Sequence, residues 1–244
     1  MNNANRTEFD RITDQIFEKY GKICTWSNEQ REKLCYIAHK LLQENEKYNL
    51  TAIKTLDGVI AKHLFDSVAV EAYIPQNTTI IDVGTGAGFP SLPLAVIRSD
   101  IRIVALDATE KKIGFVNSTA AEIGLTNVSG LYGRAEELSL QPPLREKYDC
   151  AIARSVAGLQ ILSELCLPFV KVGGKLLAMK SDRAMHEIEE SQKALTTLGA
   201  SVPDVIRLYD DENGEARLLF VSEKQNPTPS NYPRRFAQIK KKPL

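Results

Sequence analysis

Hydrophobic residues in the first fifty positions recur with the spacing of two amphipathic helices. Leu34, Ile37, Ala38, Leu41 and Leu42 fall at i, i+3, i+4, i+7 and i+8 and form one apolar stripe. An earlier stripe, ended by Gly21, consists of Phe9, Ile12, Ile16, Phe17 and Tyr20. The pattern predicts helices within residues 7–48 that cover a core, and it leaves a substrate-facing role for this segment open.

From residue 79 short apolar runs alternate with helical patterns. The runs cover 79–83, 102–107, 128–132, 148–153 and 175–180, and the helical patterns cover about 91–98, 110–124, 157–170 and 183–198. This alternation is typical of a doubly wound parallel sheet. Two last runs, 202–210 and 215–223, are joined by the turn sequence DENG, so the last strand should be antiparallel. We predict an α/β fold of the Rossmann-like class I methyltransferase type, with seven mostly parallel strands and a C-terminal β-hairpin.

The final twenty residues are rich in proline and lose the periodicity. From residue 232 to 244 there is no acidic side chain, while the segment carries Arg234, Arg235, Lys240, Lys241 and Lys242. A solvated tail and a phosphate-binding segment are both compatible with this composition. We divide the chain into an N-terminal helical extension packed on the core (1–70), a methyltransferase domain (71–224) and a basic C-terminal tail (225–244).

Composition narrows the class of protein further. The 244 residues are 43% hydrophobic and 25% charged, as in ordinary globular domains. No apolar run approaches the roughly 20 residues that span a bilayer, and no signal peptide is apparent, so we expect a cytoplasmic protein. Scattered cysteines (Cys24, Cys35, Cys150, Cys166) without a neighbouring histidine predict reduced thiols and no metal site. The net charge is zero, so contact with a polyanion must come from local patches.

The loop after the first predicted strand carries the clearest chemistry. In IIDVGTGAGFPSLPL, Gly84, Gly86 and Gly88 stand at every second position, and Phe89 takes the place of the third glycine in a dinucleotide fingerprint. The pattern D-x-G-x-G-x-G predicts a site for S-adenosylmethionine, whose amino-acid moiety must lie close to the backbone. Asp82 can support this loop and attract the cofactor ammonium, directly or through water.

Two further segments complete the predicted cofactor site. Asp107 ends the second strand, 23 residues after Gly84 and close to the offset of about 20 expected for an acid that holds ribose hydroxyls. The sequence GRAEEL follows the third strand, where the chain approaches an adenine, and Ala135 and Glu136 are the candidates there. A plain helix start, favoured by acidic residues at its N-terminus, is the alternative for this segment.

The sequence after the fourth strand disfavours two kinds of methylation. Ala153-Arg154-Ser155-Val156 lacks the prolines and aromatic ring of enzymes that methylate exocyclic amines, and Cys150 lies within the strand rather than at its end. Arg154 only donates hydrogen bonds, which suits a carboxylate, a phosphate or O6 of guanine. Guanine N7 has an exposed lone pair, so its methylation needs in-line alignment and exclusion of water but no general base.

These motifs resemble those of the RsmG (GidB) family, whose members methylate N7 of a guanine in bacterial 16S ribosomal RNA. The resemblance rests on DVGTGAGFPSLPLA, GRAEE, YDCAIARSVA, LPFVKVGGKLLAMKS, YPRR…KKKPL, YNLTAI and KHLFDSV, and covers about residues 45–244. Departures from the usual family residues are Tyr48, Lys62, Thr85, Ser91, Ser181 and Phe236-Ala237. They concern the substrate side rather than the methyl-transfer reaction.

The resemblance implies positions for both ligands. It implies cofactor contacts at Gly84, Phe89, Ala135, Glu136 and Arg154, with Arg154 orienting the reactants. On the RNA side it implies Asn49, Lys62, His63, Asp66, Ser67 and the basic tail. A purely structural role is the alternative for His63, since no catalytic partner for it is apparent in the sequence.

The expected activity is therefore methyl transfer from S-adenosylmethionine to a guanine N7 of small-subunit ribosomal RNA, by a monomer without metal or membrane contact. A small-molecule methyltransferase and a non-catalytic ribosome-assembly factor remain alternatives, and an NAD-dependent oxidoreductase fits least because of Phe89. Zero net charge predicts few phosphate contacts, hence weak binding to RNA fragments and dependence on a folded RNA or an assembled particle.

Overall fold

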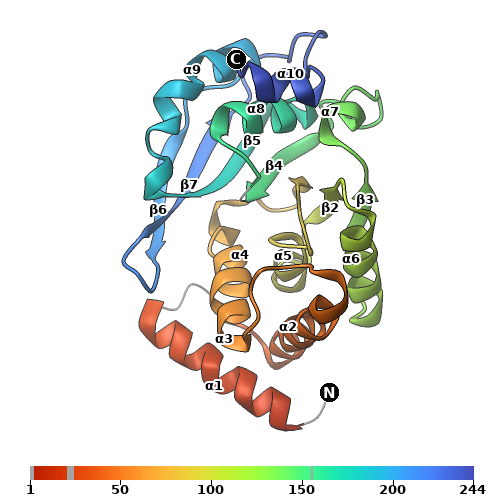
Figure 1. Cartoon of the computed structure of the whole chain (residues 1–244), viewed down its shortest axis with the longest axis vertical. Helices are drawn as coiled ribbons and strands as arrows, with labels where there is room; N and C mark the ends of the chain where they lie inside the picture. Colours follow the sequence, from red (N-terminus) through yellow and green to blue (C-terminus); the bar gives the residue numbers. More distant parts are fainter. Residues whose placement is uncertain (1–2, 21–24, 155) are drawn as a thin grey trace.

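The computed structural model describes residues 3–20, 25–154 and 156–244, and contains one seven-stranded sheet (Figure 1). Gly21, Cys24 and Ser155 lie outside the described residues. The strands are β1 Thr79–Val83, β2 Arg102–Asp107, β3 Val128–Tyr132, β4 Tyr148–Arg154, β5 Val170–Ser181, β6 Asp204–Asp210 and β7 Ala216–Glu223. Their order is β3-β2-β1-β4-β5-β7-β6, and β7 pairs antiparallel with both neighbours. The predicted fold class and the antiparallel final strand are confirmed.

The helices cover both faces of this sheet. They are α1 Asn3–Tyr20, α2 Asn28–Tyr48, α3 Leu56–Val59, α4 Asp66–Val68, α5 Ser91–Ile97, α6 Glu110–Glu122, α7 Ala135–Leu138, α8 Leu159–Cys166, α9 Glu187–Thr197 and α10 Phe236–Lys241, with a π-helical turn at Ile60–Phe65. Successive residues of a strand point to opposite faces. Accordingly Ile80 joins the core beneath α2, α5 and α6, whereas Ile81 joins the core beneath α8 and α9.

The two N-terminal helices form where the apolar stripes predict them, and α1 begins four residues earlier than predicted. α2 begins at a capping box in which Ser27 and Gln30 exchange side-chain and backbone hydrogen bonds. Leu34 and Leu41 of its stripe are fully buried. The helix ends at Asn49, whose left-handed backbone (φ 51°) closes the last turn through a hydrogen bond to Asn45 O.

The β6–β7 hairpin is tied at its turn, as the sequence DENG predicts. Asp211 Oδ1 accepts hydrogen bonds from the backbone N–H groups of Asn213 (2.8 Å) and Glu215 (3.1 Å). Gly214 has φ 76°, a conformation that favours glycine. The turn therefore has a fixed position beside the N-terminal segment (Figure 1).

The tail differs from its expected irregular state, because buried polar anchors hold it on the domain. Lys224 is fully buried and donates to Leu167 O (2.7 Å) and Thr228 Oγ1 (2.6 Å). Farther along, α10 inserts Ile239, which is fully buried, into the core around α8. The C-terminus consequently lies with α8 and α9, at the opposite end of the molecule from α1 (Figure 1).

None of the described helices is both long enough and apolar enough to cross a membrane.

Candidate active site

The glycine loop follows β1 at the carboxyl edge of the sheet. Gly84, Gly86 and Gly88 all have positive φ, of 76°, 60° and 88°. A Cβ at Gly84 would lie 2.6 Å from Val156 Cγ2, and one at Gly88 would lie 2.6 Å from Leu92 Cδ1. A Cβ at Gly86 would meet no atom within 4 Å. Gly84 and Gly88 thus permit close packing, whereas Gly86 opens the loop toward free space.

The two aspartates predicted at the cofactor site behave differently. Asp107 Oδ2 accepts a hydrogen bond from Gly86 N (2.9 Å), so this carboxylate lies directly beside the loop. Asp82 is fully buried, with Oδ2 accepting from Ser91 Oγ (2.6 Å), and among the described residues Oδ1 has no hydrogen-bond partner. Burial raises the pKa of Asp82 to about 6. Two roles were expected for Asp82. Support of the glycine loop fits its complete burial, whereas direct contact with an ammonium group does not, because the carboxylate is not exposed.

The segment after β3 lies against the same sheet edge. Gly133 N donates to Asp107 O at 3.1 Å, which connects this segment to the end of β2. Ala135 and Glu136 open the short helix α7, and Glu136 is mostly buried with Arg134 at 3.4 Å. The structure therefore brings the β1, β2 and β3 loops together, as a class I methyltransferase requires.

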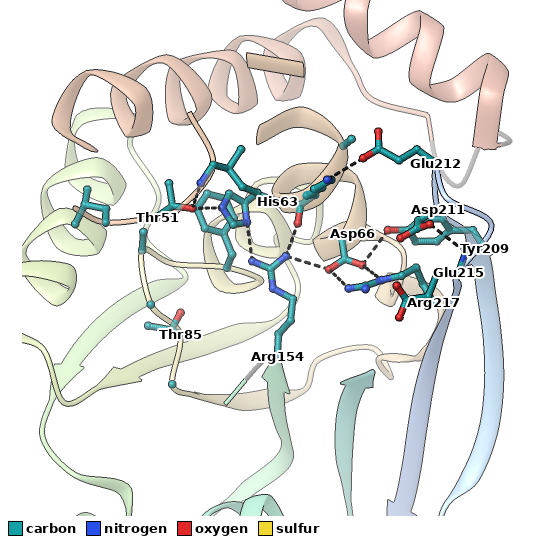
Figure 2. Close-up of a pocket in the computed structure, with 18 of the residues that line it drawn as sticks. Thr51, His63, Asp66, Thr85, Arg154, Tyr209, Asp211, Glu212, Glu215 and Arg217 are labelled. Atoms are coloured by element: carbon teal, nitrogen blue, oxygen red, sulfur yellow. Dashed lines mark hydrogen bonds and ion pairs between the residues drawn. The ribbon is translucent and has the colours of Figure 1, made fainter. Parts of the chain in front are cut away.

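A cavity of about 600 Å³ lies between the glycine loop, the N-terminal extension and the β6–β7 hairpin (Figure 2). Of the residues expected at the site, it is lined by Lys62, His63, Asp66, Gly84, Gly86, Phe89 and Arg154. The expected residues outside its lining are Asn49, Ser67, Asp82, Gly88, Asp107, Ala135, Glu136, Arg234, Arg235, Lys240, Lys241 and Lys242.

Arg154 at the end of β4 is the centre of the cavity wall (Figure 2). Its Nη1 donates to Lys62 O (2.7 Å) and to Asp66 Oδ2 (3.0 Å), and its Nη2 lies 2.9 Å from His63 Nδ1. Its guanidinium carbon lies 5.8 Å from the centroid of the Phe89 ring. Arg154 therefore joins the N-terminal extension to the glycine loop.

His63 is held as a neutral imidazole. Burial, followed by the positive charge of Arg154, lowers its pKa to about 3. Since Arg154 can only donate, Nδ1 accepts and Nε2 carries the proton toward Thr51 Oγ1, 2.8 Å away. The ring also stacks on Phe89. With both nitrogens engaged, His63 positions its neighbours rather than transferring protons.

Asp66 connects the extension to the hairpin. It is 2% exposed and accepts hydrogen bonds from Arg154, from Tyr209 Oη (2.9 Å) and from Arg217 Nε (3.3 Å). Burial acts to raise the pKa of Asp66, but the charges of the two arginines outweigh it and hold the pKa below its ordinary value. The carboxylate therefore stays ionised between two guanidinium groups.

Several residues expected to contact RNA have structural partners instead. Ser67 is fully buried and donates to His63 O, and Asp66 is enclosed, so neither offers a surface to RNA in this structure. Arg234 is bound by the buried Glu164, which accepts from its backbone N, Nε and Nη2 at 2.6–2.9 Å. Asn49 caps α2. Direct RNA contact does not fit the burial of Asp66 and Ser67, because their side chains are used inside the fold.

The remaining candidates stay accessible. Lys62 is 54% exposed and pairs with Glu212 of the hairpin turn (2.8 Å). The exposed basic residues of the tail are Arg235, Lys240, Lys241 and Lys242. Their contact with RNA stays a prediction.

No residue on the hairpin side of the cavity was predicted from the sequence. Tyr209 and Arg217 are directly opposite each other in the β6–β7 register and both line the cavity. The available signal was Arg217 directly before the apolar run LLFV of β7. Within residues 3–20, 25–154 and 156–244, no group of three or more His, Cys, Asp or Glu side chains could hold a metal ion.

The sheet with its reversed β7, the glycine loop opening at Gly86, and Asp107 beside that loop define a Rossmann-like, S-adenosylmethionine-dependent methyltransferase. An O-methyltransferase from Bacillus cereus, solved in complex with SAH, shares this fold with a TM-score of 0.53 and 19% identity, over 77% of this chain and 90% of that chain. The residues present fit the cofactor, because Gly86 leaves room for it and Asp107 lies at the position of the ribose acid.

The sequence profile of the GidB family, described as rRNA small subunit methyltransferase G, matches residues 30–213. Ribosomal RNA small subunit methyltransferase G of Clostridium botulinum (strain Eklund 17B / Type B) is 39% identical over 89% of this chain and 92% of its own length. The corresponding protein of Deinococcus deserti is 43% identical over 84% and 85%. The chain belongs to this family of methyltransferases.

Proposed function

We propose that the protein transfers a methyl group from S-adenosylmethionine to N7 of a guanine in small-subunit ribosomal RNA. One observation carries the choice of acceptor atom: each acidic or imidazole side chain that lines the cavity in the described part of the chain already has a protein partner. His63 and Asp66 are bound by Arg154. In the hairpin turn, Asp211 is bound by backbone N–H groups, Glu212 by Lys62 and Glu215 by Arg183. Such a wall offers no free general base, so it suits a nucleophile that needs no deprotonation. Guanine N7 is such a nucleophile.

The residues of this chain would bind, orient and shield the reactants. The open backbone at Gly86 and the carboxylate of Asp107 would hold the cofactor, which supplies an electrophilic methyl group when bound. The stacked rings of His63 and Phe89 fill the space between the extension and the glycine loop and would form a wall that keeps water out. Arg154, fixed by three acceptors, keeps this wall in register with the glycine loop. In-line alignment of nucleophile and methyl group would then provide most of the acceleration.

The positive charge that appears on the base during transfer would meet two arginines at the cavity wall. Asp66, a buried and ionised carboxylate, lies between Arg154 and Arg217 and offsets part of their positive charge, which reduces their repulsion of the cationic product. The carboxylate does not need to take up a proton for this role.

We extend the proposal to a monomer that acts in the cytoplasm on folded RNA or a small-subunit particle. Support comes from zero net charge, which limits the number of phosphate contacts. Each contact would contribute about 0.7–0.9 to the slope of log affinity against log salt. Affinity for a short naked hairpin should therefore be weak. Light scattering during size-exclusion chromatography tests the oligomeric state.

The test is methyl transfer from radiolabelled S-adenosylmethionine to small-subunit particles, naked ribosomal RNA and DNA. Borohydride and aniline treatment followed by primer extension then locates N7-methylguanine. The variant Gly86→Ala places a Cβ in the opening of the loop and should weaken cofactor binding by titration calorimetry. Gly124→Ala is the matched control, since Gly124 also has positive φ (68°) and open space around its Cβ position. Transfer to DNA or small molecules alone contradicts the proposal.

A further inference from the structure

Three described arginines line the cavity, and they differ in what their guanidinium groups already hold. Arg154 is 10% exposed and binds a carbonyl, a carboxylate and an imidazole nitrogen. Arg183 is 80% exposed and lies at the rim, with Nε on Glu215. Arg217 is intermediate, at 25% exposure. A ligand acceptor would have to displace an existing partner of Arg154, but it would not have to displace one of Arg217.

The attachment of Arg217 to the fold leaves part of its guanidinium group available. Nε and Nη2 reach Asp66 at 3.3 and 3.5 Å, longer than the contacts that hold Arg154. Among the described residues, no hydrogen bond from Nη1 of Arg217 is formed. Its backbone lies in β7 between Ser181 of β5 and Tyr209 of β6, so the sheet fixes its Cα position. A donor on a central strand is placed more accurately than one on a loop.

We propose that Arg217 selects guanine by donating a hydrogen bond to O6 of the target base. This inference rests on the proposed function. The edge of guanine that carries N7 presents two acceptors, N7 and O6, whereas adenine presents N7 and an amino group that donates. An arginine only donates, so adenine would place two donors face to face. Because N7 must stay free to attack the methyl group, the selective contact is a single one to O6.

The shared carboxylate makes this arrangement compatible with the reaction. Asp66 lies between Arg154 and Arg217 and offsets part of their positive charge (Figure 2). A guanidinium without such a partner would repel the base as it becomes cationic. Tyr209 completes the support by donating to Asp66 Oδ1, the oxygen that also accepts from Arg217 Nε. Arg217 is thus the contact that reads the base, and Asp66 and Tyr209 are positioning residues behind it.

The test compares two bases at the mapped target position of the RNA. One substrate carries guanine, and the other carries 2-aminopurine, which keeps N7 and the 2-amino group but lacks O6. For the wild-type protein we expect kcat/KM to be about 10- to 100-fold higher with guanine, the range for loss of one hydrogen bond to a charged group. Arg217→Met should bring this ratio close to one, because it removes the one contact that only guanine can make. Arg217→Lys, which keeps a donor, should retain part of the preference.

The ratio within one variant does not depend on how much of the protein is folded, because both rates scale with the active fraction. Arg207→Met is the matched control: this arginine lies on β6 of the same hairpin, is exposed, and pairs with Asp210 away from the cavity. It should keep the wild-type ratio. A wild-type ratio near one, or an Arg217→Met variant that slows both substrates equally, overturns the inference. A wild-type protein that methylates neither particles nor RNA overturns the proposed function instead.

Discussion

The ring of His63 lies parallel to the ring of Phe89, with centroids 4.5 Å apart and an interplanar angle of 14°. These residues come from different parts of the chain: His63 from the π-helical turn of the N-terminal extension, and Phe89 from the glycine loop. π-Helical turns often occur at functional sites. The stack makes the extension one wall of the cavity, so the cofactor loop and the substrate side of the site are mechanically connected.

The low pKa of His63 gives the protein a specific dependence of stability on pH. The folded protein keeps this imidazole neutral down to its pKa of about 3, whereas the unfolded chain takes up a proton below about pH 6.5. The unfolded state therefore binds more protons between these limits. The contribution of His63 to the free energy of unfolding should fall on acidification below pH 6.5, by at most about 1.4 kcal/mol per pH unit, and should be constant above it.

His63→Gln should remove this contribution, as measured by urea unfolding at pH values from 7.5 to 4.5. The difference in unfolding free energy between wild type and variant should be constant above pH 6.5. Below pH 6.5 the wild type should lose stability faster than the variant. His186→Gln, at an exposed position of the chain, is the control and should follow the wild type. If the unfolding free energies of wild type and His63→Gln depend on pH in the same way, the imidazole takes up its proton in the folded protein over the same pH range as in the unfolded chain.

Asp82 should produce the opposite slope. Because burial raises its pKa to about 6, the folded protein holds a proton between about pH 4 and 6 that the unfolded chain has lost. Its contribution to the free energy of unfolding therefore increases as the pH falls through this window. Asp82→Asn should be more stable than wild type at pH 8, by up to about 3 kcal/mol, and this gain should vanish near pH 4.

Urea unfolding at both pH values measures the difference, with Asp204→Asn on the exposed side of β6 as the control. An Asp82→Asn variant that is less stable than wild type at pH 8 would mean that the carboxylate is bound in a way its unpaired Oδ1 does not suggest. The buried charge of Asp82 lowers the stability of the folded protein. If this charge is needed to hold the glycine loop in its binding conformation, Asp82→Asn should also lower the affinity for the cofactor.

The cofactor half of the site could be predicted because it is local in sequence. Glycines at alternate positions after an apolar run specify a strand, a tight loop and a helix in one short segment. Asp107 follows from the next strand by the same parallel arrangement. The register of Ile81, Asp82 and Val83 with β2 then places Asp107 beside Gly86. These positions can be predicted from the order of the strands and helices along the chain alone.

The other half depends on contacts that sequence spacing does not determine. Asp66 lies 143 residues before its partner Tyr209, and it meets the hairpin only because β7 inserts between β5 and β6. The basic composition of the tail likewise does not show which of its arginines are anchored to the domain. Arg234 lies in a basic run, but its side chain has a buried acidic partner 70 residues away in α8. Charge alone does not distinguish a solvated arginine from one that holds a segment in place.

The hydrogen bond from Tyr209 to Asp66 should contribute measurably to stability. Its acceptor is a buried carboxylate, and such bonds to charged groups contribute about 1.5–3 kcal/mol. Tyr209→Phe should lower the free energy of unfolding by this amount. It should also lower methyl transfer, since Asp66 then holds Arg217 with one support fewer. Tyr132→Phe, at a tyrosine that is 57% exposed, should change neither stability nor activity and serves as the control.

The pair of Arg234 and Glu164 should decide whether the basic tail stays on the domain. Glu164 is fully buried, and removal of its partner leaves a carboxylate without compensation, which costs about 3–5 kcal/mol. Arg234→Met should lower the unfolding free energy by about that amount and accelerate trypsin cleavage after Lys240 and Lys241. Replacing both partners, as Glu164→Leu with Arg234→Met, should recover much of the loss because the unpaired charge is gone.

Arg235→Met is the matched control one position along the chain. Arg235 is exposed, so its replacement should change the unfolding free energy by no more than about 0.5 kcal/mol and should leave the cleavage rate unaltered. The same pair of variants separates structure from RNA binding. If Arg235→Met lowers affinity for small-subunit particles at unchanged stability, the exposed side of the tail contacts the RNA. Equal cleavage rates for both variants would mean that Glu164 does not anchor the tail in solution.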